Sequence, residues 1–193
     1  MRVLIAGLLG AVAMFAWTAV AHVATPLGTI GFSQLPNEAR VENDLQSGTA
    51  KSGLYIFPWV DPGDPKMMEK SSALMKVHGS GYLVYHPPGA AMEDPANMAA
   101  PLAVEFLKQL VQATVAAFLV SMMAGLGFLG RLGAVTLTGV IAGIATNVSY
   151  WNWYGYPLDY TVAQAFVEIV SAFASGLAIA WWLGRTAKPA AAS

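Results

Sequence analysis

Apolar residues make up 56% of this 193-residue chain and charged residues only 11%, whereas about a quarter of the residues in soluble domains are charged. This balance excludes an ordinary water-soluble fold and indicates an integral membrane protein. The formal net charge of -1 excludes the basic field that a nucleic-acid partner requires, and the absence of cysteine excludes disulfides, thiolate metal sites and cysteine nucleophiles.

Residues 1–24 form the first of four predicted membrane spans. The run from residue 3 to residue 24 contains no Lys, Arg, Asp or Glu, and as a helix it covers the bilayer's hydrocarbon core of about 30 Å. Arg2, the apolar run and Ala19-Val20-Ala21 also fit a signal peptide that is cleaved before His22. The apolar run is longer than the roughly 7 to 15 residues of a signal peptide. Its length favours a retained signal-anchor helix, and both alternatives stay open.

Residues 25–101 differ from the rest of the chain because they hold most of its charged residues and prolines. Short β-type runs alternate here with helix-type runs, which predicts a small α/β domain in which two short helices cover a three-stranded sheet. A domain this small is marginal alone, so we expect its apolar face to rest on the ends of the spans or on a partner. The predicted strands are residues 28–32, 53–59 and 81–86, and the predicted helices are residues 36–46 and the segment from Asp64, an N-cap before Pro65, to Gly79.

Three further spans follow this domain, each close to the roughly 20 residues that a spanning helix needs. The predicted fold class is therefore a membrane all-α four-helix bundle with a small α/β extracytoplasmic domain inserted between spans one and two. The remaining segments are spans at 102–130, 131–150 and 161–184, an aromatic outer loop at 151–160 and a tail at 185–193.

Positive charges in the short segments predict the orientation of the spans. Arg2 precedes span one, Arg131 lies in the predicted turn between spans two and three, and Arg185 and Lys188 follow span four. All of these map to one side, so we expect both termini to be cytoplasmic and residues 25–101 to be periplasmic. The opposite connection, Tyr150 to Pro157, is rich in Trp and Tyr and has no basic residue, as expected of an outer interfacial belt.

Polar residues inside the spans are the best lead to a function. Glu168 lies roughly 10 Å below the outer boundary of span four, where an acidic residue costs about 3 kcal/mol unless it is paired or protonated. One reading is a hydrogen-bonded network that fixes helix packing. Another is an outward-facing binding pocket around Glu168, and a third is a contact with another subunit. The candidate binding residues are Glu168, Gln164, Glu105, Gln112, Asn147 and His22.

Small residues predict where the helices approach closely. Gly139 and Gly143 form a GxxxG motif in span three, and Ser171 and Ser175 repeat the small-xxx-small spacing in span four. These faces can meet within one chain or join two copies of it, and the motif alone does not decide.

No catalytic, cofactor or metal site is predicted. His22, Glu105 and Glu168 are suitable metal ligands by type, but no two of them have the i, i+3 or i, i+4 spacing of a metal site on one helix. His86 ends a predicted strand and precedes two prolines, and no Ser or Asp is placed to make it a catalytic base.

Five motifs lie along the chain: His22-x-x-x-Pro26-Leu27-Gly28, Leu35-Pro36-x-Glu38, the run from Gly53 to Trp59, the run from Tyr82 to Gly89, and the run from Tyr150 to Pro157. Together they resemble a family of small, uncharacterised bacterial inner-membrane proteins, and the resemblance covers nearly the whole chain. It implies a bacterial inner-membrane location and no chemistry.

Three function classes follow from these features. The first is an accessory or assembly subunit of a larger membrane complex, because the chain combines a compact bundle with an outer domain and has no reaction motif. The second is a protein that binds or transports a small molecule or ion in the polar pocket around Glu168, and the third is a membrane enzyme. The expected partners are the lipid bilayer and another protein or a second copy of the chain.

Overall fold

The computed structural model describes residues 1–48, 51–90, 97–123 and 125–185 of the chain. These residues divide into two compact units. The first unit joins Met1–Phe32 to the described residues from Met98 onward, and the second unit is Ser33–Asn97.

The first unit is helical. Helix α1 is Arg2–Val23, α4 is Ala99–Met122 and α7 is Leu158–Arg185. The remaining long helix begins as α5 (Phe128–Gly143) and continues through the π-helical turn η2 (Ile144–Val148) into α6 (Ser149–Tyr154). All four are long and apolar enough to cross a membrane, as the sequence predicts.

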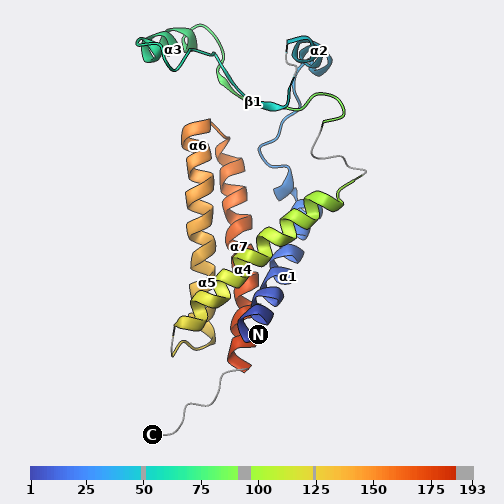
Figure 1. Ribbon diagram of the computed structural model, residues 1–193, viewed down its shortest axis with the longest axis vertical. Helices are drawn as coiled ribbons and strands as arrows, with labels where there is room; N and C mark the ends of the chain where they lie inside the picture. Colours follow the sequence, from blue (N-terminus) through green and yellow to red (C-terminus); the bar gives the residue numbers. More distant parts are fainter. Residues whose placement is uncertain (49–50, 91–96, 124, 186–193) are drawn as a thin grey trace. The chain divides into compact units, whose positions relative to one another are not determined.

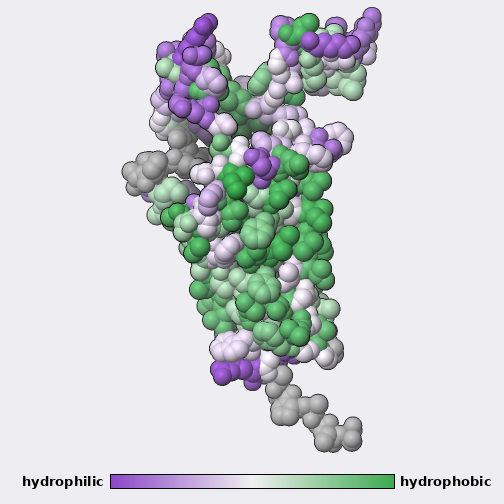
Figure 2. Space-filling view, turned by 180° about the vertical axis from the view of Figure 1, so that it is seen from behind, coloured by the Kyte–Doolittle hydropathy of each residue, from purple (hydrophilic) through white to green (hydrophobic). Residues whose placement is uncertain are grey.

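The outer surface of these helices is hydrophobic, as a lipid-facing surface is. On the face that Figure 2 shows, most of the surface of the helical unit is apolar. Large apolar side chains of these helices remain exposed, such as Ile141 at 68%. Such exposure is unfavourable in water and favourable in lipid.

The helices pack in the order α4, α1, α7, α5. Helix α1 packs along both α4 and α7, and α5 packs along α7, whereas α4 touches α5 and α7 in few places. Figure 1 shows α5 and α7 side by side and α4 crossing α1 at an angle. The core between α1, α4 and α7 is built largely of alanine together with Met14, Val120 and Ile179, which lets the backbones approach closely.

The connection between α4 and α5 differs from the prediction, in which the spans at 102–130 and 131–150 follow each other directly. Helix α4 ends at Met122 because Met123 adopts an extended ψ of 90°, and Gly125 has a φ of +81°. Helix α5 then begins at Phe128, so Arg131 lies in its first turn and not in the connection.

The second unit contains a two-stranded antiparallel sheet, not the three-stranded sheet predicted. Strand β1 (Gly53–Phe57) pairs with β2 (Gly81–Tyr85). The remaining predicted strand, residues 28–32, lies in the first unit, where it forms the end of the 3-10 helix η1 (Pro26–Gly28) and the turn that follows it. Its Gly31 has a φ of +85° and lies against Tyr160 of α7, where a Cβ would be 2.5 Å from the Tyr160 Cβ. This backbone conformation excludes a strand.

Two short helices are present as predicted, one before each strand in sequence, with shifted starts. Helix α2 is Glu38–Gly48 and α3 is Met67–Met75. Asp64 and Pro65 precede α3 instead of beginning it. The Asp64 carboxylate accepts a hydrogen bond from the backbone N–H of Lys66, 2.8 Å away, and from the Lys70 ammonium. Both bonds hold the pKa of Asp64 below its usual value.

The second unit has almost no core of its own. Among its described residues, Tyr85 is the one buried hydrophobic side chain, at 8% exposure. On one face of the β1–β2 ribbon, Leu54 lies opposite Val84, and these side chains are 64% and 65% exposed. Burial of apolar surface is the main driving force for folding, so this unit gains little stability from its own packing.

Candidate functional site

A groove between α4 and α5 is the candidate site of the helical unit. Because α4 packs on α1 while α5 packs on α7, the two helices leave a cavity of about 340 Å³ between them. The wall residue Val111 is 64% exposed, so this groove opens on the lipid-facing surface. We call it the α4–α5 groove; its lining residues are Met14, Val111, Gln112, Ala113, Val115, Ala116, Leu119, Val135, Thr138, Gly139, Ala142, Glu168, Ala172 and Ser175.

Glu168 and Gln112 form the polar part of this groove. Gln112 Nε2 donates to Glu168 Oε1 at 3.5 Å, which is at the long limit of a hydrogen bond. Gln112 Oε1 is buried and has no hydrogen-bond partner. Glu168 is the eleventh residue of α7, so it lies about 15 Å along that helix from Leu158. The two side chains therefore leave hydrogen-bonding capacity unused inside an apolar surface.

Ser175 lies two turns further along α7 and also lines the groove. Its hydroxyl is buried without a partner, and it faces α1, where a Cβ on Gly10 would be 2.6 Å from Ser175 Oγ. Ser175 therefore serves the α1–α7 contact and does not belong to the polar pair.

A second set of polar side chains crosses from α4 through α1 to α7, and we call it the polar relay. Lys108 Nζ lies 2.8 Å from Glu105 Oε1. Gln109 Nε2 donates to Glu105 Oε1 at 2.8 Å and to Thr18 Oγ1 at 3.1 Å. Thr18 Oγ1 is in turn 3.4 Å from Ser171 Oγ. Gln109 is only 2% exposed, and its Oε1 is buried without a partner. The relay joins α4, α1 and α7 through partly buried hydrogen bonds.

Replacing Gln109 with Leu tests the polar relay. Interhelical hydrogen bonds in membrane proteins contribute about 0.6 kcal/mol each and up to about 1.7 kcal/mol. We therefore expect Gln109→Leu to lower the free energy of unfolding by about 1 to 2 kcal/mol. Thr18→Val provides the second arm of a double-mutant cycle, measured by reversible unfolding in mixed micelles. Additive effects of the two changes would show that the hydrogen bond between them does not contribute to stability.

The structure divides the predicted binding residues and does not bring all of them together. Glu168 and Gln112 meet in the α4–α5 groove, and Glu105 belongs to the polar relay. His22 is exposed, and its Nδ1 donates to the Thr18 carbonyl oxygen at 2.9 Å within α1. Asn147 is buried in the π-helical turn, where its Nδ2 donates to the Gly143 carbonyl oxygen at 3.0 Å.

Gln164 lies one turn before Glu168 on α7 and is partly exposed. Two contacts between α1 and α7 were missed by the sequence analysis: Thr18 lies 3.4 Å from Ser171, and Trp17 Nε1 donates to the Val167 carbonyl oxygen at 3.1 Å. Thr18 and Trp17 carry polar groups in an otherwise apolar span, and this is the signal that could have identified them.

The predicted packing residues lie at contacts within the chain. A Cβ on Gly139 would be 2.3 Å from the Ala172 Cβ, and a Cβ on Gly143 would be 3.5 Å from the Ala165 Cα. The GxxxG face of α5 is therefore occupied by α7 of the same chain. Ser171 and Ser175 face α1, as their contacts with Thr18 and Gly10 indicate.

Basic residues gather at one end of α7. The Arg2 guanidinium donates to the Leu183 carbonyl oxygen, and Trp182 Nε1 donates to the Arg2 carbonyl oxygen at 3.1 Å. The Arg185 guanidinium lies 4.7 Å from the centre of the Trp181 ring. Cations at a helix C-terminus interact favourably with its dipole, and these contacts join the start of α1 to the end of α7.

Aromatic residues gather at the other end of α7. Tyr156 lies 5.2 Å from Tyr150 and 5.4 Å from Tyr160, measured between ring centres. Phe32 contacts Tyr160 with ring centres 5.7 Å apart. Such a cluster is typical of a membrane–water interface.

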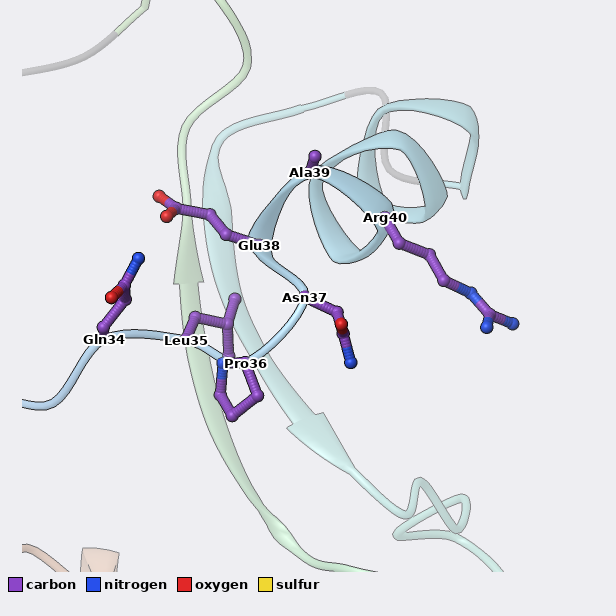
Figure 3. A pocket seen from close by; sticks show the side chains of 7 residues that line it. All are labelled: Gln34, Leu35, Pro36, Asn37, Glu38, Ala39 and Arg40. Atoms are coloured by element: carbon purple, nitrogen blue, oxygen red, sulfur yellow. The ribbon is translucent and has the colours of Figure 1, made fainter.

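Two other features do not form a site. The second unit has a hollow of about 600 Å³ lined by seven consecutive residues, Gln34 to Arg40. All of them are exposed, and Figure 3 shows that their side chains fan apart instead of converging. In addition, no three His, Cys, Asp or Glu side chains cluster as metal ligands in the part of the chain that the structure describes.

The fold and the groove together define a class: a helical membrane protein with four helices of spanning length and a polar pair in a lateral groove. Comparisons with family models, curated proteins and solved structures find no match for this chain.

Proposed function

We propose that this chain is a binding protein of the membrane, which takes a small amphiphilic molecule from the lipid into the α4–α5 groove. The observation that supports this proposal is the combination of apolar walls with the unsatisfied polar pair Glu168 and Gln112. Ligand pockets are commonly cavities of roughly 300 to 1,000 Å³, mostly apolar, with a few polar groups that orient the ligand. The groove meets each of these criteria.

The purely structural role considered for the polar residues fits the polar relay better than the groove. In the relay, Gln109 Nε2 donates at 2.8 Å and 3.1 Å, which are ordinary hydrogen-bond lengths. In the groove, the hydrogen bond between Gln112 and Glu168 is at the long limit, at 3.5 Å. Because Gln109 Oε1 and Gln112 Oε1 are both buried without a partner, the two sets differ in the length of their hydrogen bonds and in the groove that lies beside Glu168 and Gln112.

The proposed location is a bacterial inner membrane, with both termini cytoplasmic and residues 25–101 periplasmic. The family resemblance supports the bacterial location. The positive-inside rule supports the orientation, because Arg2 and Arg185 lie at the same end of α7.

An accessory or assembly subunit of a larger complex is the second candidate. It is favoured by the second unit, whose ribbon face with Leu54 and Val84 is exposed and which buries little of its own apolar surface. A partner protein that covers this face would supply the missing burial. The two candidates are compatible, since an accessory subunit can also bind a small molecule.

Native mass spectrometry of protein purified in lipid nanodiscs tests both candidates. We expect a bound small molecule with the wild type and at least about tenfold less of it with Ala142→Phe, because a ring at this lining position fills the groove. Ile141→Phe is the matched control, because Ile141 is the neighbouring residue on the lipid-facing surface and does not line the groove.

Equal recovery of small molecules from the wild type and from Ala142→Phe would refute binding in the groove. The accessory role predicts instead a co-purifying polypeptide that is lost in Leu54→Ser. Retention of that polypeptide in this variant would contradict a partner contact on the ribbon face.

A further inference from the structure

We infer that the ligand of the α4–α5 groove is a cationic amphiphile, whose ammonium group pairs with Glu168 and whose aliphatic chain lies between α4 and α5. The inference rests on the proposed function and specifies the chemistry of the ligand. Three features of the groove carry it: its sign of charge, its unused acceptors and its apolar walls.

The groove has one charged group, and no basic side chain in the described part of the chain pairs with it. The ion pairs among the described residues are Arg40–Asp44, Lys70–Asp64 and Lys108–Glu105. Lys108 is one turn from Gln112 on α4, but its ammonium lies 2.8 Å from Glu105 Oε1. Glu168 therefore has no cationic partner within the described chain, and a cation from outside is the complement that the groove lacks.

The hydrogen-bonding groups of the polar pair are mainly acceptors. Gln112 Oε1 is a buried acceptor without a donor, and the Glu168 carboxylate receives only the long contact from Gln112 Nε2. An ammonium group carries three donors and no acceptor. It can therefore bind the carboxylate and the amide oxygen together, in charge-assisted hydrogen bonds stronger than those between neutral groups.

The apolar walls of the groove determine the chemistry of the rest of the ligand, beyond its ammonium group. Val111, Val115 and Leu119 line the groove from α4, and Val135 and Ala142 line it from α5. These side chains offer no hydrogen bonds, so they suit an aliphatic chain. At about 340 Å³ the groove is near the lower end of the range for ligand pockets, and a longer chain can extend into the lipid through the exposed side at Val111 and Val115.

The same features argue against other ligands. An anionic head group meets Glu168 with no basic residue beside it in the groove. A bound metal ion requires more ligands than Glu168 and the amide oxygen of Gln112, and the described residues contain no cluster of three ionisable ligands. A neutral alcohol supplies one donor, whereas the Glu168 carboxylate and Gln112 Oε1 both lack a close donor.

Photoaffinity labelling of the full chain in phosphatidylcholine nanodiscs tests the inference, because this lipid contains no primary amine. Three diazirine probes share a dodecyl chain and end in an amine, an alcohol or a carboxylic acid. We expect the amine probe to label α4 and α5 with an affinity at least about tenfold higher than that of the alcohol, and the acid probe to bind least.

Glu168→Gln is expected to lower the affinity for the amine probe by about tenfold or more and to change the affinity for the alcohol by less than about twofold. Glu105→Gln is the matched control: it removes a carboxylate from a neighbouring position that does not line the groove, and the amine affinity should stay unchanged. Gln112→Leu provides an independent arm if Glu168→Gln does not fold, and it should also lower the amine affinity.

The outcomes separate the inference from the proposed function. If the amine and alcohol probes bind the wild type equally, or if Glu168→Gln and Gln112→Leu both keep the amine affinity, the cationic ligand is excluded while binding in the groove stands. If no probe labels the groove and Ala142→Phe changes nothing, the proposed function fails as well.

Discussion

A chain that lacks residues 1–21 is expected to lose α4 from the helical unit. Helix α1 lies between α4 and α7, whereas α4 touches α5 and α7 in few places. The polar relay also passes through α1, since Gln109 of α4 reaches Ser171 of α7 only by way of Thr18. Without α1, helix α4 keeps only its few contacts with α5 and α7, among them the long hydrogen bond from Gln112 to Glu168.

Spin-label distances between α4 and α7 measure this effect. The chain has no cysteine, so Val104→Cys and Val162→Cys introduce unique labels at exposed positions of the two helices. We expect one narrow distance distribution in the full chain and a broad one in the truncated chain. A narrow and unchanged distribution in the truncated chain would contradict the central role of α1.

The same packing predicts that residues 1–21 are retained. Ala6, Gly10, Ala11 and Met14 of α1 are buried against its neighbours, which is the arrangement of a permanent bundle helix. Intact-mass measurement of the purified protein should therefore include these residues. A mass that is lower by residues 1–21 would instead establish the cleaved signal peptide that the Ala19-Val20-Ala21 motif permits.

Replacing Gly139 with Leu should be the most destabilising point change in the contact between α5 and α7. A Cβ at this position would lie 2.3 Å from the Ala172 Cβ and 3.0 Å from the Glu168 carbonyl oxygen. Neither atom is the end of a flexible side chain, so the helices must move apart. Overpacking of this kind costs about 1 to 3 kcal/mol or more. We expect a loss of this size in the free energy of unfolding, measured by reversible unfolding in mixed micelles.

Two variants make this prediction specific. Gly133→Leu is the matched control, because Gly133 lies on the same helix and a Cβ there would meet nothing within 4 Å. Gly139→Ala should be destabilising alone and should be rescued by Ala172→Gly, which removes the Cβ that it meets. Equal effects of Leu at positions 133 and 139, or the absence of rescue, would show that this close approach does not limit stability.

Local physical chemistry predicted the helices of the first unit well. A long apolar run without charge can satisfy its backbone in lipid only as a helix, so α1, α4, α5 with its continuation, and α7 followed from the residues alone. Their ends were harder, because Met123 and Gly125 end α4 by backbone conformations that apolar length does not report.

The small domain was predicted less completely. The strands at Gly53–Phe57 and Gly81–Tyr85 were found because β-branched and aromatic residues recur there between glycines and prolines. The error at residues 28–32 has a tertiary cause: Gly31 adopts a positive φ where it lies against Tyr160, a residue far along the sequence. The short run Gly28-Thr-Ile-Gly-Phe32 contains no signal for that contact.

The candidate site shows the same division. Glu168 stood out in the sequence because an acidic residue in a span is costly. The residues that contact Glu168 could not be predicted from the sequence in the same way. Helical periodicity places Gln164 and Glu168 on one face of a helix, but it does not say which other helix packs against that face. His22 and Asn147 were predicted as binding residues because of their depth in the membrane. In the structure, each donates a hydrogen bond to a backbone carbonyl oxygen of its own helix.

The sequence by itself determined that the chain is a membrane protein with four helices of spanning length, where its basic and aromatic residues concentrate, and that Glu168 is the unusual residue among them. These properties depend on hydrophobicity and charge along the chain, which are local. Only the tertiary structure decided that α1 separates α4 from α7, that the GxxxG face of α5 is used within the chain, and that a groove opens between α4 and α5. These properties depend on which small side chains allow two backbones to approach, and such complementarity exists only between helices that are already side by side.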